Sequence, residues 1–247
     1  MPRQPRFVVP DIALHVRQRG NNGQACFLAD GDRLVYLANL RELCVKTGCA
    51  LHAYCLMTNH VHLLLTPPDA ASCANLMRDL GQRYVQYFNR HHERTGTLWE
   101  GRYRSCLVDS AHYVLGCYRY IERNPVRAGM VAWPSAYRWS SHAANTGLAP
   151  SPMLAPHAEY LALATDEAMR HAAYQGILDA DEDPAFLAAI RDATDGGYAL
   201  LGGDTKAKLM ESGRRLERGK PGRRSAGIAD EEDSAATLAE LQGQLGL

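Results

Sequence analysis

The sequence predicts an α+β fold, a ferredoxin-like antiparallel sheet with helices packed on it, followed by a C-terminal helical extension. Three observations support this prediction. The hydrophobic period changes between two and about 3.6 residues in the order strand, helix, strand, strand, helix, strand. One more helical segment follows, and the composition then changes after a stretch rich in Gly and Pro at 147–152. The 247 residues suffice for one domain of ordinary size plus an appendage.

The first three strands and the first helix are predicted before residue 66. Apolar and polar side chains alternate over 12–17, the period of a half-buried strand, and an Asn-Asn-Gly turn follows at 21–23. Helical spacing begins near Asp32 and stops at Gly48. The next two apolar stretches are predicted to form a hairpin, joined by a short Met-Thr-Asn link, and they cover residues 49–56 and 60–65.

The second half of the sheet is predicted between residues 70 and 123. A long helix covers about 70–94. The strand that follows, 101–108, carries Arg102 and Arg104 on one face. Ser110 is a suitable N-cap for a helix that runs from residue 111 toward residue 123.

Composition divides the chain into four segments, and we place their boundaries at 1–146 for the first domain, 147–157 for a linker, 158–225 for a helical extension with a basic segment, and 226–247 for an acidic, disordered tail. Within the extension, Asp183-Pro184 predicts the start of a helix and Gly196-Gly197 its end. A basic helix is predicted over about 205–218.

The overall composition excludes several classes of protein. No apolar run approaches the roughly 18 residues of a membrane span and no signal peptide is recognisable, so we expect a cytoplasmic protein without a membrane partner. The seven cysteines have no zinc-ribbon spacing, which favours reduced, mostly buried thiols over disulfides.

The net charge of zero is a cancellation between segments. Residues 1–149 carry a charge of +7, 150–203 carry −7, 204–225 carry +5 and 226–247 carry −5. Sixteen of the 17 cations in the first block are Arg, whose planar guanidinium suits phosphate and base edges. The neutral total therefore does not exclude a nucleic-acid partner for the basic blocks, and we hypothesise that the acidic segments shield these blocks when no such partner is bound.

Two histidines in the predicted hairpin form the first candidate site. Side chains at i and i+2 of a strand point to the same face, so His60 and His62 stand side by side and can share one divalent cation. The alternative is two polar residues on a solvated sheet face.

The helix after residue 110 holds the second candidate group. At 100° per residue Tyr118 falls on the core stripe, whereas Tyr113, Tyr120 and Asn124 lie on its flank. Periodicity does not choose between Tyr113 and Tyr120, and either can be an aromatic residue at the edge of the core. Asn124 precedes Pro125, a pair that commonly caps a helix, so a capping role is the alternative to a functional one.

Two motifs in this chain resemble a known family. The segments 57–64 (MTNHVHLL) and 120–130 (YIERNPVRAGM) are similar to the single-tyrosine HUH transposases, in particular to the branch of REP-associated tyrosine transposases. HUH denotes histidine, a hydrophobic residue and histidine. The similarity covers about residues 5–141 and includes QRGNN at 18–22 and GTLWEGR at 96–102.

The resemblance implies a mechanism and a site. His60 and His62 would bind the catalytic metal, Mg²⁺ or Mn²⁺, Tyr120 would be the nucleophile, and Asn124 would complete the metal site. The implied reaction is metal-dependent cleavage and rejoining of single-stranded, hairpin-containing DNA through a 5′-phosphotyrosine intermediate. The segment 1–146 would be the catalytic domain. Arginines in the basic block are candidate DNA contacts, namely Arg83, Arg90, Arg102, Arg104, Arg119, Arg123 and Arg127.

Two other functions remain open at this point. A regulator derived from a transposase would bind hairpin DNA or RNA without cutting it, and a metal-dependent nuclease would use water, with Tyr120 only orienting the substrate. For the transposase we favour a monomer over a homodimer and expect a cytoplasmic, nucleoid-associated location. We interpret six further histidines as surface or core residues, namely His15, His52, His91, His92, His112 and His142.

Overall fold

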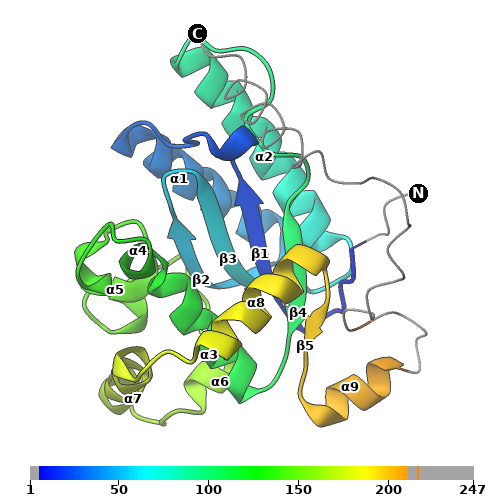
Figure 1. The fold of residues 1–247 in the computed structure, drawn as a ribbon, viewed down its shortest axis with the longest axis vertical. Coiled ribbons are helices and arrows are strands. Elements are labelled where there is room, and N and C mark those ends of the chain that lie inside the picture. The colour runs from blue at the N-terminus through cyan, green and yellow to red at the C-terminus, as the bar shows by residue number, and fades with distance from the viewer. Residues whose placement is uncertain (1–5, 211–215, 217–247) are drawn as a thin grey trace, which may run out of the picture.

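The structure is a computed structural model that describes residues 6–210 and 216 (Figure 1). The first part of the chain forms four strands and three long helices, namely β1 Ala13–Arg19, α1 Asp30–Thr47, β2 Ala50–Leu56, β3 His60–Thr66, α2 Ser72–His91, β4 Arg104–Val108 and α3 Ala111–Glu122. Seven further elements follow within the described residues, namely α4 Asn124–Arg127, α5 His142–Asn145, α6 Ala158–Leu161, α7 Glu167–Asp179, α8 Pro184–Gly196, β5 Ala199–Leu200 and α9 Gly203–Met210. Two 3-10 turns, Asn21–Gly23 and Pro134–Ala136, complete the assignment.

The sheet has five strands in the order β2-β3-β1-β4-β5. The first four strands pair antiparallel, and β5 adds to β4 in parallel. The central position of β1 between β3 and β4 is the arrangement that the order of elements predicts. The α+β, ferredoxin-like prediction is thus confirmed for the part of the chain before residue 123.

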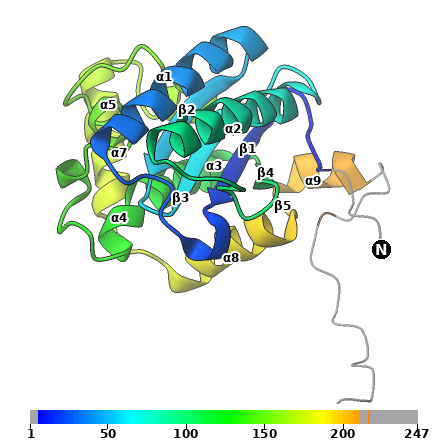
Figure 2. The ribbon, with the colours of Figure 1, turned by 90° about the horizontal axis from the view of Figure 1, so that it is seen from above.

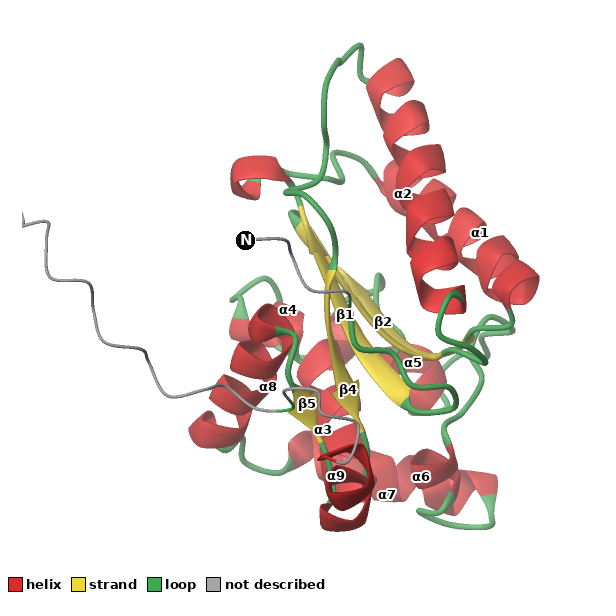
Figure 3. Cartoon of the chain, turned by 90° about the vertical axis from the view of Figure 1, so that its right-hand side faces the viewer, coloured by secondary structure: helices red, strands yellow, loops and turns green. Residues whose placement is uncertain are grey.

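Helices cover both faces of the sheet. Figure 2 shows α1 and α2 side by side on one face, with α8 on the opposite side of the strands. Helix α3 packs with α8 on this second face, against β2, β3 and β4. In Figure 3, α6, α7 and α9 gather around the lower end of the sheet. The predicted helical extension therefore packs on the same sheet as the first domain.

Several local predictions are confirmed. Asp183 caps α8 by accepting a hydrogen bond from the Ala185 N–H, and Gly197 ends the helix in the left-handed conformation. Tyr118 is fully buried. All seven cysteines are free and buried, and they pack in the core as small apolar side chains. No helix in the described ranges is long and apolar enough to cross a membrane.

Other local predictions need correction. Strand β4 begins only at Arg104, since residues 100–102 form a bend in which Gly101 has a positive φ of 71°. Ser110 occupies the N-cap position of α3 without a side-chain capping bond, because its own φ is +78°. The two-residue strand β5 is too short to show a sequence period. The predicted basic helix is described only as far as Met210, and the acidic tail 226–247 lies outside the described residues.

Candidate active site

The two predicted histidines lie near the start of β3, on the face that α3 covers. His62 is paired with Arg17 of β1 and with Cys55 of β2, so it occupies the centre of the sheet. His60 is half-buried and is the first residue of the strand. Their ring centroids are 4.9 Å apart, and both rings line one pocket of about 190 Å³. The i, i+2 spacing therefore places both rings where the sequence predicted.

His62 is held from behind by a third histidine. His15 of β1 stacks on His62 with ring centroids 5.1 Å apart, and its Nε2 lies 2.9 Å from His62 Nδ1. On its other side, His15 Nδ1 lies 2.8 Å from the hydroxyl of Thr194 in α8. Burial lowers the pKa of His15 to about 3 and holds the pKa of His62 well below the usual value, so both rings are neutral at neutral pH.

His60 is oriented by the turn that precedes it. Its Nδ1 donates to Asn59 Oδ1 at 2.7 Å, because the Asn59 amide nitrogen is used as a donor to Gly23 O. The backbone N–H of Gly20 donates to Asn59 O at 2.8 Å, which fixes this turn against the loop after β1. Burial, followed by repulsion from Arg17 and Arg19, lowers the pKa of His60 to about 4. Its ring is therefore also neutral and able to act as a ligand.

Tyr120 projects from α3 into the same pocket. Its ring meets His62 edge to face at a centroid distance of 5.6 Å. The guanidinium of Arg127 lies 4.5 Å from the centre of the Tyr120 ring. Tyr113, the other tyrosine that periodicity left open, stacks on Phe186 of α8 and is not part of this pocket.

Asn124 also lines the pocket, as the first residue of α4. Arg123 is the N-cap of that short helix, and its cap position has no side-chain hydrogen bond. Among the described residues no hydrogen bond engages the Asn124 side-chain amide, so the predicted capping role does not account for this side chain. The structure thus brings His60, His62, Tyr120 and Asn124 into one pocket.

The seven candidate arginines divide into separate groups. Three of them contact the end of α7 and the connection to α8. Arg119 donates to Ala180 O, Arg123 to Leu178 O of α7, and Arg127 to the Glu182 carboxylate. Arg104 donates to Asp195 O at the end of α8, and Arg102 is exposed in the loop before β4. Arg83 and Arg90 lie on α2, across the sheet from Tyr120. Of these seven arginines, Arg127 is the one that lines the pocket of the candidate site.

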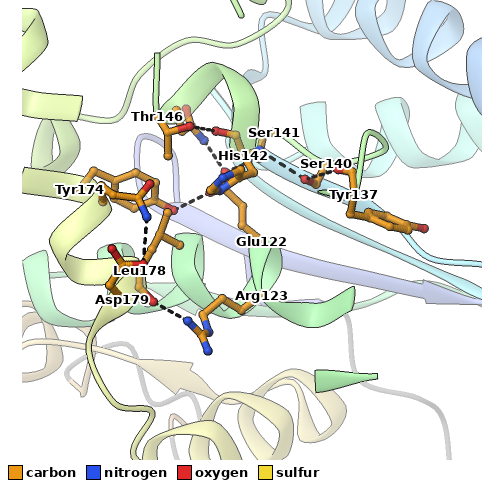
Figure 4. Close-up of polar contacts among 12 residues, drawn as sticks. Glu122, Arg123, Tyr137, Ser140, Ser141, His142, Thr146, Tyr174, Leu178 and Asp179 are labelled. Carbon is orange, nitrogen blue, oxygen red and sulfur yellow. Dashed lines mark hydrogen bonds and ion pairs between the residues drawn. The ribbon is translucent and has the colours of Figure 1, made fainter. Parts of the chain in front are cut away.

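The C-terminal end of α3 is anchored by a buried carboxylate (Figure 4). Glu122 accepts hydrogen bonds from the Ser141 hydroxyl at 2.6 Å, the Asn145 amide at 2.7 Å and the Tyr174 hydroxyl at 2.8 Å. On the same turn, Arg123 donates to Leu178 O of α7. These bonds fix the turn of α3 that carries Tyr120.

The donor set of the pocket fits a divalent metal. Nδ1 of His60 and Nδ1 of His62 are each engaged behind the pocket, which leaves the two Nε2 atoms as candidate ligands. The amide oxygen of Asn124 is an oxygen donor of the kind that Mg²⁺ and Mn²⁺ accept.

A second group of residues that could ligate a metal lies elsewhere in the structure and consists of Asp32, His91 and His92. The Asp32 oxygens already accept hydrogen bonds from the N–H groups of Leu28 and Ala29 and lie within 2.9 Å of His92 Nε2. This carboxylate therefore has a structural role at the start of α1, and the group carries no argument for a catalytic metal.

Sequence reasoning missed four polar residues of the pocket region, and one of them, Arg17 of β1, lines the pocket beside His62. The sequence predicts His15 only as a surface or core residue, because its proximity to His62 depends on the register between β1 and β3. Thr194 and Arg191 lie on α8, about 70 residues beyond α3, and only the tertiary fold brings them here. The alternation His15, Arg17, Arg19 along β1 was the available signal, since it gave one polar face to that strand.

Comparisons with known proteins agree with this description. The family model of IS200-like transposases matches residues 9–124. The structure of a REP-associated tyrosine transposase bound to a REP hairpin is similar at a TM-score of 0.51 and 14% identity, covering 64% of this chain and 92% of that one. A protein of Deinococcus radiodurans R1, named as a candidate transposase, is 21% identical over 52% of this chain and 92% of that one, at a TM-score of 0.35.

No curated protein matches the chain. The family match nevertheless spans β1 to the start of α4, and it includes the histidine pair and the tyrosine helix. The resemblance noted from the motifs is confirmed by this match, and the solved structure shares the fold. Over residues 9–124 this chain is therefore similar to the IS200-like transposases.

Proposed function

We propose that the protein is a metal-dependent DNA strand transferase that cleaves and rejoins single-stranded, hairpin-containing DNA through a 5′-phosphotyrosine intermediate. One observation carries the proposal. Two neutral imidazoles, a tyrosine and an asparagine amide, taken from β3, α3 and α4, line a single pocket together with Arg17, Arg127 and Arg191. A pocket lined by neutral metal ligands and by arginines can hold a divalent cation next to a phosphate.

Tyr120 is the proposed nucleophile. Its phenolic oxygen would form a bond to the scissile phosphorus while the bond from phosphorus to the DNA 3′ oxygen breaks. The phenol loses its proton and the departing oxygen gains one, so the products are a 5′-phosphotyrosine and a free 3′-hydroxyl. The phosphotyrosyl bond keeps the phosphoester reactive, so a 3′-hydroxyl can reverse the step and rejoin the strand without a nucleotide cofactor.

His60, His62 and Asn124 are the proposed metal ligands, and a bound Mg²⁺ or Mn²⁺ would polarise the scissile phosphate and offset its developing negative charge. Arg127 lies against the face of Tyr120 and borders the space that a phosphate would occupy. Arg191 lines the pocket from α8 and has no carboxylate partner within the described ranges. We assign these two cations to the phosphates on either side of the cleaved bond.

The proposed substrate is single-stranded DNA with a stem-loop. The motif resemblance supports this choice, as does the hairpin bound by the similar solved structure. The two histidines and Tyr120 meet within one chain, which supports a monomer with Tyr120 acting on its own metal site. Because the proposed substrate is DNA, we expect the protein to be associated with the nucleoid in the cytoplasm.

The experiment is a covalent-adduct assay. The protein is incubated with end-labelled, single-stranded stem-loop DNA taken from the sequence flanking its gene, with Mg²⁺ or Mn²⁺, and resolved on a denaturing gel. We expect a labelled protein band that Tyr120→Phe abolishes. The matched control is Tyr113→Phe, which removes a hydroxyl from the same helix outside the pocket and should leave the band unchanged.

The other outcomes decide between the alternatives. Cleavage without an adduct, retained in Tyr120→Phe, would favour a metal-dependent nuclease. Binding without cleavage would favour a hairpin-binding regulator. An adduct that persists in Tyr120→Phe would exclude Tyr120 as the nucleophile.

A further inference from the structure

A chain of hydrogen bonds runs behind His62 from the sheet into the C-terminal extension. It passes from His62 Nδ1 to His15 Nε2 at 2.9 Å, and from His15 Nδ1 to the Thr194 hydroxyl at 2.8 Å. The Thr194 hydroxyl in turn lies 2.7 Å from Ile190 O, one helical turn earlier in α8. His15, His62 and Thr194 are each 1% exposed, so water does not replace any of these bonds.

The donor and the acceptor of each hydrogen bond follow from the last acceptor in this series, Ile190 O. Ile190 O only accepts, so the Thr194 hydroxyl donates to it and offers its lone pairs to His15. His15 Nδ1 therefore carries a proton, and a neutral imidazole then has a bare Nε2. That Nε2 accepts from His62 Nδ1–H, which leaves the lone pair of His62 on Nε2, the atom that is free to face the pocket.

The reverse direction would conflict with the same contacts. If His15 donated from Nε2, its bare Nδ1 would need a proton from Thr194, and Ile190 O would lose its side-chain donor. His62 would then hold its proton on Nε2 and have no lone pair to offer to a metal. The thiol of Cys106, 3.3 Å from the Thr194 oxygen, can serve as a further donor and supports the accepting role of that oxygen.

We propose that His15 and Thr194 are positioning residues that hold His62 protonated on Nδ1, so that helix α8 of the C-terminal extension is part of the metal-ligand assembly. This inference rests on the proposed function only in one respect, namely that a divalent metal binds at His62. The buried contacts predict the tautomer of His62 whether or not a metal binds. Partners of this kind commonly change metal affinity by about 10-fold to 100-fold when they are removed.

The experiment uses the full chain with Thr194→Val, which replaces the hydroxyl by a methyl group of similar size. Thr194→Ser restores the hydroxyl, and Thr194→Ala serves if the valine variant does not fold. The matched control is Thr47→Val, because Thr47 makes the same bond to the carbonyl four residues earlier, in α1 at Leu43. Circular dichroism and thermal unfolding verify that each variant is folded.

Two measurements follow on the metal-free protein. Long-range proton–nitrogen NMR of the imidazoles reports which nitrogen of His62 carries the proton. Titration with Mn²⁺ alone, followed by the EPR signal of the free ion, gives the affinity. We expect Thr194→Val to shift His62 toward a mixture of tautomers and to weaken Mn²⁺ binding at least 10-fold, whereas Thr194→Ser and Thr47→Val behave as the unaltered protein.

The outcomes separate this inference from the proposed function. If Mn²⁺ binds the unaltered protein and Thr194→Val changes neither the tautomer nor the affinity, the positioning role is wrong while the metal site stands. If the tautomer depends on Thr194 but Mn²⁺ does not bind, the positioning role is supported and the metal-dependent function is wrong.

Discussion

Neutral imidazoles with polar partners occur at three buried histidines, His15, His52 and His62, and at the half-buried His60. Burial lowers the pKa of His15 to about 3 and the pKa values of His52 and His60 to about 4, and it lowers that of His62 further. The buried contacts explain why neutral rings are tolerated, since each nitrogen that faces protein has a hydrogen-bonding atom in reach. The same contacts make the fold sensitive to acid.

The pH dependence of stability tests this interpretation at His52. Its folded pKa of about 4 lies below the unfolded value of 6.5, so the unfolded chain binds protons more readily between these values. Stability is therefore complete above pH 6.5 and is lost as the pH falls toward 4, by about 3 kcal/mol for this residue. We expect His52→Gln to reduce the slope of unfolding free energy against pH in that range, measured by urea denaturation.

The control is His112→Gln, because His112 is exposed on α3. It should leave the slope as it is in the unaltered protein. Equal slopes for the unaltered protein and His52→Gln would contradict the assignment of a low pKa to His52.

The position of helix α3 depends on the residues just after Tyr120. Glu122 is fully buried and receives three hydrogen-bond donors, from Ser141 just before α5, Asn145 of α5 and Tyr174 of α7. Removing its charge leaves those donors facing an amide that cannot accept from all of them. We expect Glu122→Gln to destabilise the fold by about 2 kcal/mol, which corresponds to a fall in Tm of roughly 4–8 °C for a chain of this size.

Calorimetry or fluorescence melting measures this change. Glu167→Gln is the matched control, since Glu167 is exposed at the start of α7, and it should change Tm little. A melting temperature for Glu122→Gln within a degree of the control would show that the Glu122 contacts do not anchor α3.

The turn that carries Asn59 and His60 depends on a glycine in the neighbouring loop. A Cβ atom at Gly20 would lie 2.1 Å from the backbone oxygen of Gln24, so no side-chain rotation can relieve the overlap. We expect Gly20→Ala to displace the loop and to destabilise the protein by more than about 2 kcal/mol, measured by urea denaturation. Gly176→Ala, in open space on α7, should instead raise stability by roughly 0.5–1 kcal/mol, and a loss there equal to that of Gly20→Ala would contradict the steric argument.

The elements were predictable from the sequence to the extent that local signals define them. Alternation located β1, an apolar stretch located β3, and the Asp-Pro and Gly-Gly pairs located α8 to the residue. Two-histidine spacing predicted the shared face of His60 and His62. The bend before β4 and the two-residue strand β5 were not predictable, because positive φ at Gly101 and pairing with β4 depend on distant contacts.

The packing of the extension on the candidate site could not be read from the sequence at all. Composition separated residues after 147 as an appendage, yet α8 covers β4 and β1 and supplies Thr194 and Arg191 to the site region. Side-chain periodicity specifies that α8 has an apolar face, but not which surface that face meets. The site therefore draws on segments that sequence reasoning had assigned to separate parts of the chain.

The distribution of charge over the whole molecule explains its zero net charge. The basic block of 1–149 and the acidic block of 150–203 meet directly, through Arg127–Glu182 at 2.6 Å, Arg123–Glu182 at 3.6 Å and Arg17–Asp195 at 2.7 Å. The acidic residues near α8 thus neutralise arginines that border the candidate site. The hypothesis that acidic segments shield the basic ones rests on charge counts, and these ion pairs name the residues that would do so within 150–203. The acidic tail 226–247 lies outside the described residues.

Glu182 is the residue at which shielding can be tested, because its carboxylate contacts two of the arginines beside Tyr120. Glu182→Gln keeps the shape of the side chain and releases the charge of Arg127 and Arg123 toward a bound phosphate. We expect tighter binding of single-stranded stem-loop DNA at low salt and a steeper fall of affinity with salt, by nearly one unit in the slope of log K against log salt concentration. Glu167→Gln makes the same change in net charge on α7, where Glu167 faces solvent, and separates local release from a general charge effect. Fluorescence anisotropy across a salt series measures both variants, and equal slopes for the two would mean that Glu182 does not compete with DNA for these arginines.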